Sequence, residues 1–94
     1  MNIRNFRHKA LRRLYEEDQR SGLPQKLVTR ISDILAIIQA ASKVSRLAAF
    51  PGLRLHRLKG DLAGFWSISV SGNWRIVFRV EHDEVWDIDL VDYH

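Results

Sequence analysis

The sequence predicts an α+β domain in which two to three N-terminal helices pack on a mainly antiparallel sheet of four to five strands. Apolar residues recur at helical spacing up to about residue 50, and from about residue 53 they alternate singly. Short turn-forming segments join the alternating runs, which is typical of antiparallel neighbours. Because 94 residues suit one small domain, we expect residues 1–94 to form a single unit.

The first half of the chain predicts the helical layer. Residues 3–6 suit a short strand, and apolar residues at helical spacing predict a helix over residues 8–17. A longer helix is expected over residues 24–41, because proline suits a helix start and the apolar positions form one stripe. We interpret this stripe as a core-facing side. Residues 42–50 predict a short third helix or an irregular segment, ended by Pro51-Gly52.

The second half predicts the sheet. Residues 65–70, 74–80 and 85–91 alternate as strands do. Residues 53–59 alternate less cleanly, and a bulge near Arg57 would reconcile them. The expected turns are Ser71-Gly72-Asn73 and His82-Asp83-Glu84.

Matching apolar faces predicts the strand register, because a slip of one residue would expose the core face. Extending the ladder of the last two strands brings Asp92 beside Trp74 and His94 near Gly72, so the chain end should lie close to Arg75. The expected pairs are Val80–Trp86, Arg79–Asp87, Phe78–Ile88, Val77–Asp89, Ile76–Leu90 and Arg75–Val91, with Trp66–Phe78, Ile68–Ile76 and Ser69–Arg75 on the other side.

Charge is distributed unevenly along the chain. Residues 1–80 carry all 15 Lys and Arg and five of the 11 acids, a net charge of +10, whereas residues 81–94 carry six acids and no Lys or Arg. The basic part indicates a nucleic-acid or other anionic partner, or simply a solvated basic surface. The chain has no cysteine, which excludes disulfides and thiolate metal sites. With no apolar stretch of membrane-spanning length and no signal peptide, we expect a soluble cytoplasmic protein.

Six residues form a candidate catalytic set suited to metal-free cleavage of RNA. Such cleavage needs a base for the 2′-hydroxyl, a cation for the phosphate and an acid for the leaving oxygen. Histidine suits either proton role, arginine and lysine suit the phosphate, and tyrosine could stack on a base or bond the phosphate. Each side chain also has a purely structural interpretation, such as an exposed terminus, a sheet cap or an ion pair. No histidine shows zinc-ligand spacing, so neither a metal site nor a cofactor is predicted. The set is His56, Lys59, Arg75, Asp92, Tyr93 and His94.

Four short motifs resemble HigB-type toxins of the RelE/ParE toxin–antitoxin superfamily: PGLRLHRLKG at 51–60, GFWSI at 64–68, GNWRI at 72–76 and the final DYH at 92–94. The resemblance implies a RelE-like fold and an mRNA endonuclease that cuts message positioned in the ribosomal A site. It implies metal-free chemistry leaving a 2′,3′-cyclic phosphate, carried by the same six residues. Which of Asp92 and His94 acts as base and which as acid stays open.

The resemblance also implies partners. These are a HigA-type helix-turn-helix antitoxin that binds operator DNA, the ribosome and mRNA, with no membrane. Two alternatives remain from other classes: a ParE-like gyrase-inhibiting binding toxin and a non-catalytic nucleic-acid-binding relative. Candidate contacts to ribosomal RNA, which for any one residue could instead serve solubility, are Arg4, Arg7, Lys9, Arg12, Arg13, Arg54 and Arg57.

Overall fold

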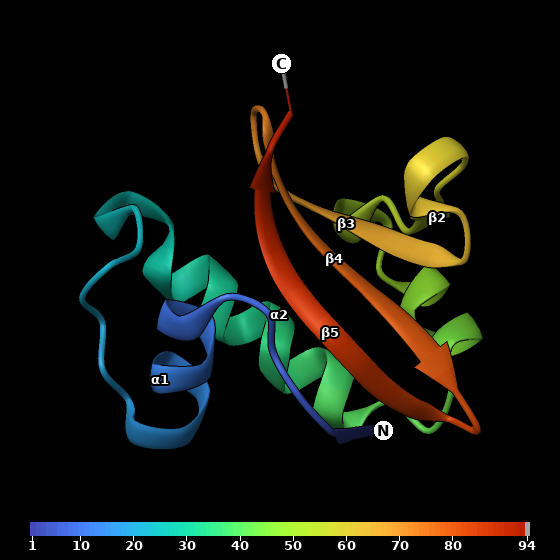
Figure 1. The fold of residues 1–94 in the computed structure, drawn as a ribbon, viewed down its shortest axis with the longest axis horizontal. Coiled ribbons are helices and arrows are strands. Elements are labelled where there is room, and N and C mark those ends of the chain that lie inside the picture. The colour runs from blue at the N-terminus through green and yellow to red at the C-terminus, as the bar shows by residue number, and fades with distance from the viewer. Residues whose placement is uncertain (94) are drawn as a thin grey trace.

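Five strands form one sheet in the order β1-β5-β4-β3-β2, and the helices cover one of its faces (Figure 1). The computed structural model describes residues 1–93. In Figure 1, α2 runs behind β4 and β5 and α1 lies beside it, which confirms the expected α+β class. The elements are β1 (Asn2–Ile3), α1 (Lys9–Glu17), η1 (Gln25–Leu27), α2 (Val28–Ala40), η2 (Val44–Ala49), η3 (Pro51–Leu53), β2 (His56–Arg57), η4 (Gly60–Leu62), β3 (Phe65–Ser71), β4 (Trp74–Glu81) and β5 (Glu84–Asp92).

The helices begin and end where local chemistry favours it. His8 caps α1, since its Nδ1 accepts a hydrogen bond from the Leu11 N–H at 3.3 Å. The helix ends at Asp18, whose left-handed backbone (φ 54°) turns the next N–H, of Gln19, back to donate to the Arg13 carbonyl at 3.2 Å. The long second helix starts with the single 3₁₀ turn η1 before α2. The third segment is a 3₁₀ helix, η2, so the expectation of a short helix there is confirmed.

The core lies between α2 and the sheet. The apolar stripe of α2 is buried, as expected, and it packs against apolar side chains from the three long strands. Replacing one such isoleucine by alanine typically costs about 2–5 kcal/mol, so this contact dominates the stability of a domain this small. The fully or nearly fully buried members are Val28, Ile31, Ile34, Leu35 and Ile38 from α2, and Ile68, Ile76, Phe78, Val85 and Ile88 from the sheet.

Most of the expected register is confirmed. Trp66 pairs with Phe78, Ile68 with Ile76 and Ser69 with Arg75, with a bulge following between Ser69 and Ser71. Between β4 and β5, the pairs Arg75–Val91, Ile76–Leu90 and Val77–Asp89 are also as expected, and the ladder ends on Trp74–Asp92.

The hairpin end of β4 and β5 is different, and the expected three-residue turn is wrong. The turn is His82-Asp83 alone, with φ values of 52° and 58°, and Glu81 faces Glu84. Positive φ at both turn residues gives the right twist for a two-residue hairpin. The shift of register is absorbed by a bulge, because Phe78 lies opposite both Asp87 (φ 57°) and Ile88.

The pairs beyond this bulge are therefore corrected. Val80 faces Val85 rather than Trp86, and Arg79 faces Trp86 rather than Asp87. The Arg79–Asp87 interaction nevertheless forms across the bulge, with Nε of Arg79 2.8 Å from Oδ2 of the carboxylate.

The two edge strands are short. β1 pairs with β5 in parallel, and the chain continues along β5 as the N–H of Arg4 donates to the Val85 carbonyl at 2.7 Å and that of Arg7 to Ile88 at 2.8 Å. β2 forms only the pairs His56–Ser67 and Arg57–Trp66. The irregular alternation here comes from an edge strand that ends after two residues, and the expected bulge near Arg57 does not occur in the described ladder. No helix within residues 1–93 is both long and apolar enough to cross a membrane.

Candidate active site

Strand pairing places His56 and Arg75 on the face of the sheet opposite α2, which we call the helix-free face, whereas Asp92 lies in the alternate row with Trp74. Residues directly opposite each other on neighbouring strands point to the same side. One row across this face is His56, Ser67, Val77 and Asp89. The next row is Ser69, Arg75 and Val91. His56 and Arg75 therefore share a face, although the sequence pattern left the orientation of His56 open.

Arg75 lies on β4 and its guanidinium turns toward the β3–β4 turn. Its Nη1 donates to the carbonyl of Gly72 at 2.6 Å and to that of Trp74 at 3.0 Å. It forms no ion pair with any carboxylate of residues 1–93. A positive charge held by neutral carbonyls retains its attraction for an incoming phosphate.

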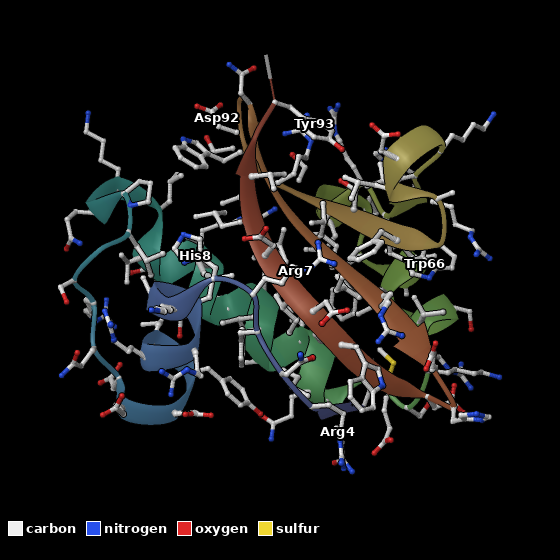
Figure 2. All side chains as sticks on the ribbon, in the orientation of Figure 1. Arg4, Arg7, His8, Trp66, Asp92 and Tyr93 are labelled. Atoms are coloured by element: carbon white, nitrogen blue, oxygen red, sulfur yellow. The ribbon has the colours of Figure 1, made fainter. Side chains whose placement is uncertain are left out.

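The end of β5 lies next to Arg75, as expected. Asp92 pairs with Trp74, and the N–H of Tyr93 donates to the Asn73 carbonyl at 2.8 Å. Alternation sends the Asp92 and Tyr93 side chains to opposite sides of the strand end, where Figure 2 labels them. The Tyr93 side chain remains 38% exposed, which is unusual for a large apolar side chain within residues 1–93. His94 lies outside the described residues.

His56 and Lys59 come from β2 and the residues just after it, and both are exposed. Nδ1 of His56 lies 3.2 Å from the Arg54 carbonyl. Because a carbonyl can only accept, this contact places a hydrogen on Nδ1 and leaves Nε2 as the outward nitrogen. A neutral His56 then offers Nε2 as a proton acceptor, and a protonated one offers an N–H donor.

The candidate set thus forms two groups: the β2 half, His56 and Lys59, and the β4–β5 half, Arg75, Asp92 and Tyr93. β2 and β5 are separated by three strand spacings, or about 14 Å at the usual distance between neighbouring strands. Arg75, on β4, is nearer, at two spacings from β2 or about 10 Å. A substrate lying across the sheet can contact both halves. An apolar depression of about 390 Å³ near the end of α2 contains none of these residues, being lined by Ile37, Ala40, Ala41, Ser42, Arg46 and Phe50.

The seven basic residues expected to contact RNA differ in their surroundings. Arg4 forms an exposed ion pair with Glu84, and Arg12 forms one with Glu16, each with a nitrogen–oxygen distance of 3.4 Å. Arg54 occupies a left-handed backbone position with φ 48°. Lys9 is exposed and Arg13 is half-buried.

Two further members of this set stack on aromatic rings. Arg7 lies 5.2 Å from the ring centre of Phe65, and Arg57 lies 5.1 Å from that of Trp66. Stacking on a ring face leaves the edge of the guanidinium available for phosphate. Figure 2 shows Arg7 in front of β5, on the helix-free face.

Comparison with known proteins decides the family. Residues 4–94 match the family of HigB-like toxins, described as the RelE-like toxin of the type II toxin–antitoxin system HigB. The chain belongs to this HigB family. It is 40% identical over 92 residues to Endoribonuclease HigB of Proteus vulgaris, covering 98% of this chain and 99% of the relative. It is 36% identical over 75 residues to Toxin HigB-1 of Vibrio cholerae, covering 79% of each.

Solved structures share the fold of this HigB-family toxin. A chain of the heterotetrameric YoeB-YefM toxin-antitoxin complex from Staphylococcus aureus has a TM-score of 0.60 at 24% identity, covering 100% of this chain and 97% of the other. A YoeB/ParE toxin from Agrobacterium tumefaciens has a TM-score of 0.53 at 24% identity, and the match covers 100% of this chain and 99% of that toxin. The resemblance inferred from the four motifs is confirmed, as is the RelE-like fold.

Within residues 1–93 of this HigB-family toxin, Arg79 and Asp87 at the β5 bulge form an ion pair that shifts the pKa of both groups. The hydrogen bond from Arg79 lowers the pKa of Asp87, and a second bond from Asn5 Nδ2 at 3.0 Å lowers it further. The same contact raises the pKa of Arg79. Asn5 also accepts from the Asp87 N–H at 2.7 Å, so it bonds both the backbone and the side chain of the bulge. Among residues 1–93, no cluster of three or more His, Asp or Glu is placed to hold a metal ion.

Arg30 was not among the candidate residues, although it contacts the backbone on both sides of the site. Its guanidinium donates to the carbonyls of Gly52, Ser69 and Val70 at 2.9, 3.3 and 3.3 Å. No sequence signal singles it out, because Arg30 lies beside the apolar stripe of α2 with Lys26 and Asp33 as helical neighbours.

Proposed function

We propose that this HigB-family toxin is a ribosome-dependent endoribonuclease that cuts translated message in the A site by metal-independent acid–base chemistry. The observation that carries the proposal is the shared face of His56 and Arg75, with the end of β5 adjoining it. The name of the Proteus vulgaris relative, Endoribonuclease HigB, supports the reaction class at 40% identity over nearly the whole chain.

The proposed chemistry uses six side chains: His56, Lys59, Arg75, Asp92, Tyr93 and His94. Proton transfer from the 2′-hydroxyl and to the 5′ leaving oxygen falls to the imidazoles and the Asp92 carboxylate. Arg75 and Lys59 stabilise the charge that develops on the phosphate, and Tyr93 stacks on a base or bonds the phosphate. The attacking 2′-oxygen displaces the 5′ oxygen, so the products are a 2′,3′-cyclic phosphate and a 5′-hydroxyl.

The width of the site supports the dependence on the ribosome. His56 and Lys59 lie about 10 Å from the strand of Arg75 and about 14 Å from that of Asp92, so a mobile RNA strand must be ordered over this width before all of these side chains contact it. A message already held in the decoding site has one conformation. Most of the conformational entropy that the RNA strand would lose on binding the toxin has therefore been lost beforehand. The exposed arginines, including Arg7 and Arg57, provide contacts to ribosomal RNA.

The proposed partners follow from the family. We propose a HigA-type helix-turn-helix antitoxin, which binds operator DNA and through which alone the toxin meets that DNA. A structural neighbour of this chain was solved as a YoeB–YefM toxin-antitoxin complex, which supports a protein antitoxin in general. Action on translated messages places the toxin in the cytoplasm.

The test combines mapping and chemistry. The toxin is induced without its antitoxin, and the 5′ ends of translated messages are mapped, where in-frame cuts are expected. In a purified ribosome assay, a message with a 2′-deoxy sugar at the cut position should stay intact, because it lacks the nucleophile. The cleaved control should carry a 2′,3′-cyclic phosphate; a 3′-hydroxyl product would contradict the proposed chemistry.

Matched variants identify the site. His56→Asn, Asp92→Asn and removal of residues 92–94 should each lose cleavage. His82→Asn in the β4–β5 turn and Asp33→Asn on α2 change the same residue types at exposed positions remote from the site and should retain it. Inhibition of supercoiling with intact messages would indicate a ParE-like toxin instead, and normal growth would indicate a non-catalytic relative.

A further inference from the structure

Arg30 on α2 bonds two segments of backbone that are far apart in the sequence. Its Nη2 donates to the Gly52 carbonyl at 2.9 Å and to Ser69 at 3.3 Å, and its Nε donates to Val70 at 3.3 Å. Gly52 lies in η3, just before β2, whereas Ser69 and Val70 lie in β3. The side chain is half-buried, so these bonds are partly shielded from water.

The segment of β3 that Arg30 contacts is the bulge. The register shifts between Ser69 and Ser71, so Val70 has no opposite partner on β4. A bulge removes regular ladder bonds and leaves its carbonyls in need of donors, which Arg30 provides. Immediately on either side of the bulge, Ser69 pairs with Arg75 and Ser71 pairs with Trp74, the residue opposite Asp92.

The other contact, at Gly52, lies upstream of the β2 half. β2 pairs with β3 at only two residues, which is too little to hold its position alone. Its downstream flank is held by the Leu58 N–H on the Phe65 carbonyl at 2.9 Å. Its upstream flank is held by buried Leu53 and by Arg30 on Gly52.

We propose that Arg30 is a positioning residue that sets the spacing between the β2 half and the β4–β5 half of the site. Its catalytic consequence rests on the proposed ribonuclease function, whereas its effect on the spacing does not. Arginine is required because its planar fork reaches three carbonyls at once, whereas a lysine at the same position offers one compact ammonium. Misplacement by about 1 Å costs catalysis on the order of 10²-fold, so a small change of spacing is sufficient.

The spacing is tested first, without reference to activity. The chain contains no cysteine, so two exposed positions, Asp61→Cys and Ser71→Cys, can carry spin labels on either side of the site. Arg30→Lys should broaden or shift the distance distribution, while Arg46→Lys, the same change at an exposed residue of η2, should leave it unchanged. Arg30→Gln serves as the second variant if Arg30→Lys fails to fold. An unchanged distribution in a folded Arg30 variant overturns the proposal.

Kinetics then test the consequence. With ribosome-bound message at saturation, Arg30→Lys should lower kcat on the order of 10²-fold with KM nearly unchanged. A rise in KM with kcat unchanged would show that Arg30 binds RNA rather than positioning the site, and a loss matching the unfolded fraction would show a purely structural role. If the unsubstituted toxin cleaves nothing, the proposed function fails, and the distance measurement still decides whether Arg30 sets the spacing.

Discussion

Substituting Arg75 should separate catalysis from stability. In Arg75→Ala, two hydrogen bonds to the carbonyls of Gly72 and Trp74 are lost. The Gly72 carbonyl lies at an exposed turn, where water replaces the guanidinium, and the Trp74 carbonyl is partly buried at the start of β4, so we expect a loss of about 1 kcal/mol of unfolding free energy. By contrast, water does not replace the guanidinium as a partner for the negative charge that develops on the phosphate. Removing a preorganised donor there typically costs about 10²–10³ in rate, or roughly 2.7–4 kcal/mol.

The assay pairs single-turnover cleavage of ribosome-bound message with urea unfolding of the same preparations. The cleavage rate of Arg75→Lys should lie between those of the unsubstituted toxin and Arg75→Ala, because lysine keeps the positive charge and loses the bidentate geometry. Arg20→Ala is the control, since Arg20 is exposed and belongs to neither the candidate catalytic set nor the candidate RNA contacts. The reasoning is refuted if Arg75→Ala loses less than about tenfold in rate, well short of the loss expected for such a donor. It is also refuted if the variant loses stability and activity by equal free energies.

Three further predictions concern other parts of the molecule. Because the bond from Arg79 lowers the pKa of Asp87, its ionised form stabilises the folded state above the usual carboxyl range, and this stability is lost as pH falls through the lowered value. Asp87→Asn should therefore flatten the pH dependence of urea stability below about pH 4, and an unchanged slope would contradict it. Asp83→Gly should stabilise the turn by about 0.5–1 kcal/mol at constant m-value, because glycine suits the φ of 58° there, and a lower urea midpoint would count against it. Arg54→Gln and Arg57→Gln should each weaken ribosome binding and reduce the salt slope of log K by about 1, whereas solubility residues would leave the slope unchanged.

Local pattern was sufficient for much of the fold. The period of the apolar residues predicted the helices and long strands, and matching apolar faces predicted Ser69 opposite Arg75 and Asp92 opposite Trp74. The Ser69–Arg75 pair lies within a few residues of the β3–β4 turn, whereas the Trp74–Asp92 pair is at the far end of the β4–β5 hairpin, beyond the bulge opposite Phe78. Matching apolar faces determines both pairs. The expectation that the end of β5 lies beside Arg75 is confirmed for this reason.

The same reasoning failed at the other end of that hairpin. Matching apolar side chains favoured a three-residue loop, but two residues without glycine form the turn, with positive φ at His82 and Asp83. The register is recovered only through the Asp87 bulge, whose backbone N–H is bonded by Asn5. Asn5 is 82 residues away in the sequence, so no local pattern connects it to the turn.

The sequence by itself determined the fold class, the facing pairs near the β3–β4 turn and the family, since each depends on the period of apolar residues or on short motifs. Only the tertiary structure decided that His56 shares a face with Arg75 and that the candidate residues fall into two groups on different strands. It alone revealed Arg30, which bonds carbonyls 22 to 40 residues away. A side chain bonded to distant backbone leaves no periodic signal, because its partners are carbonyls that every residue carries.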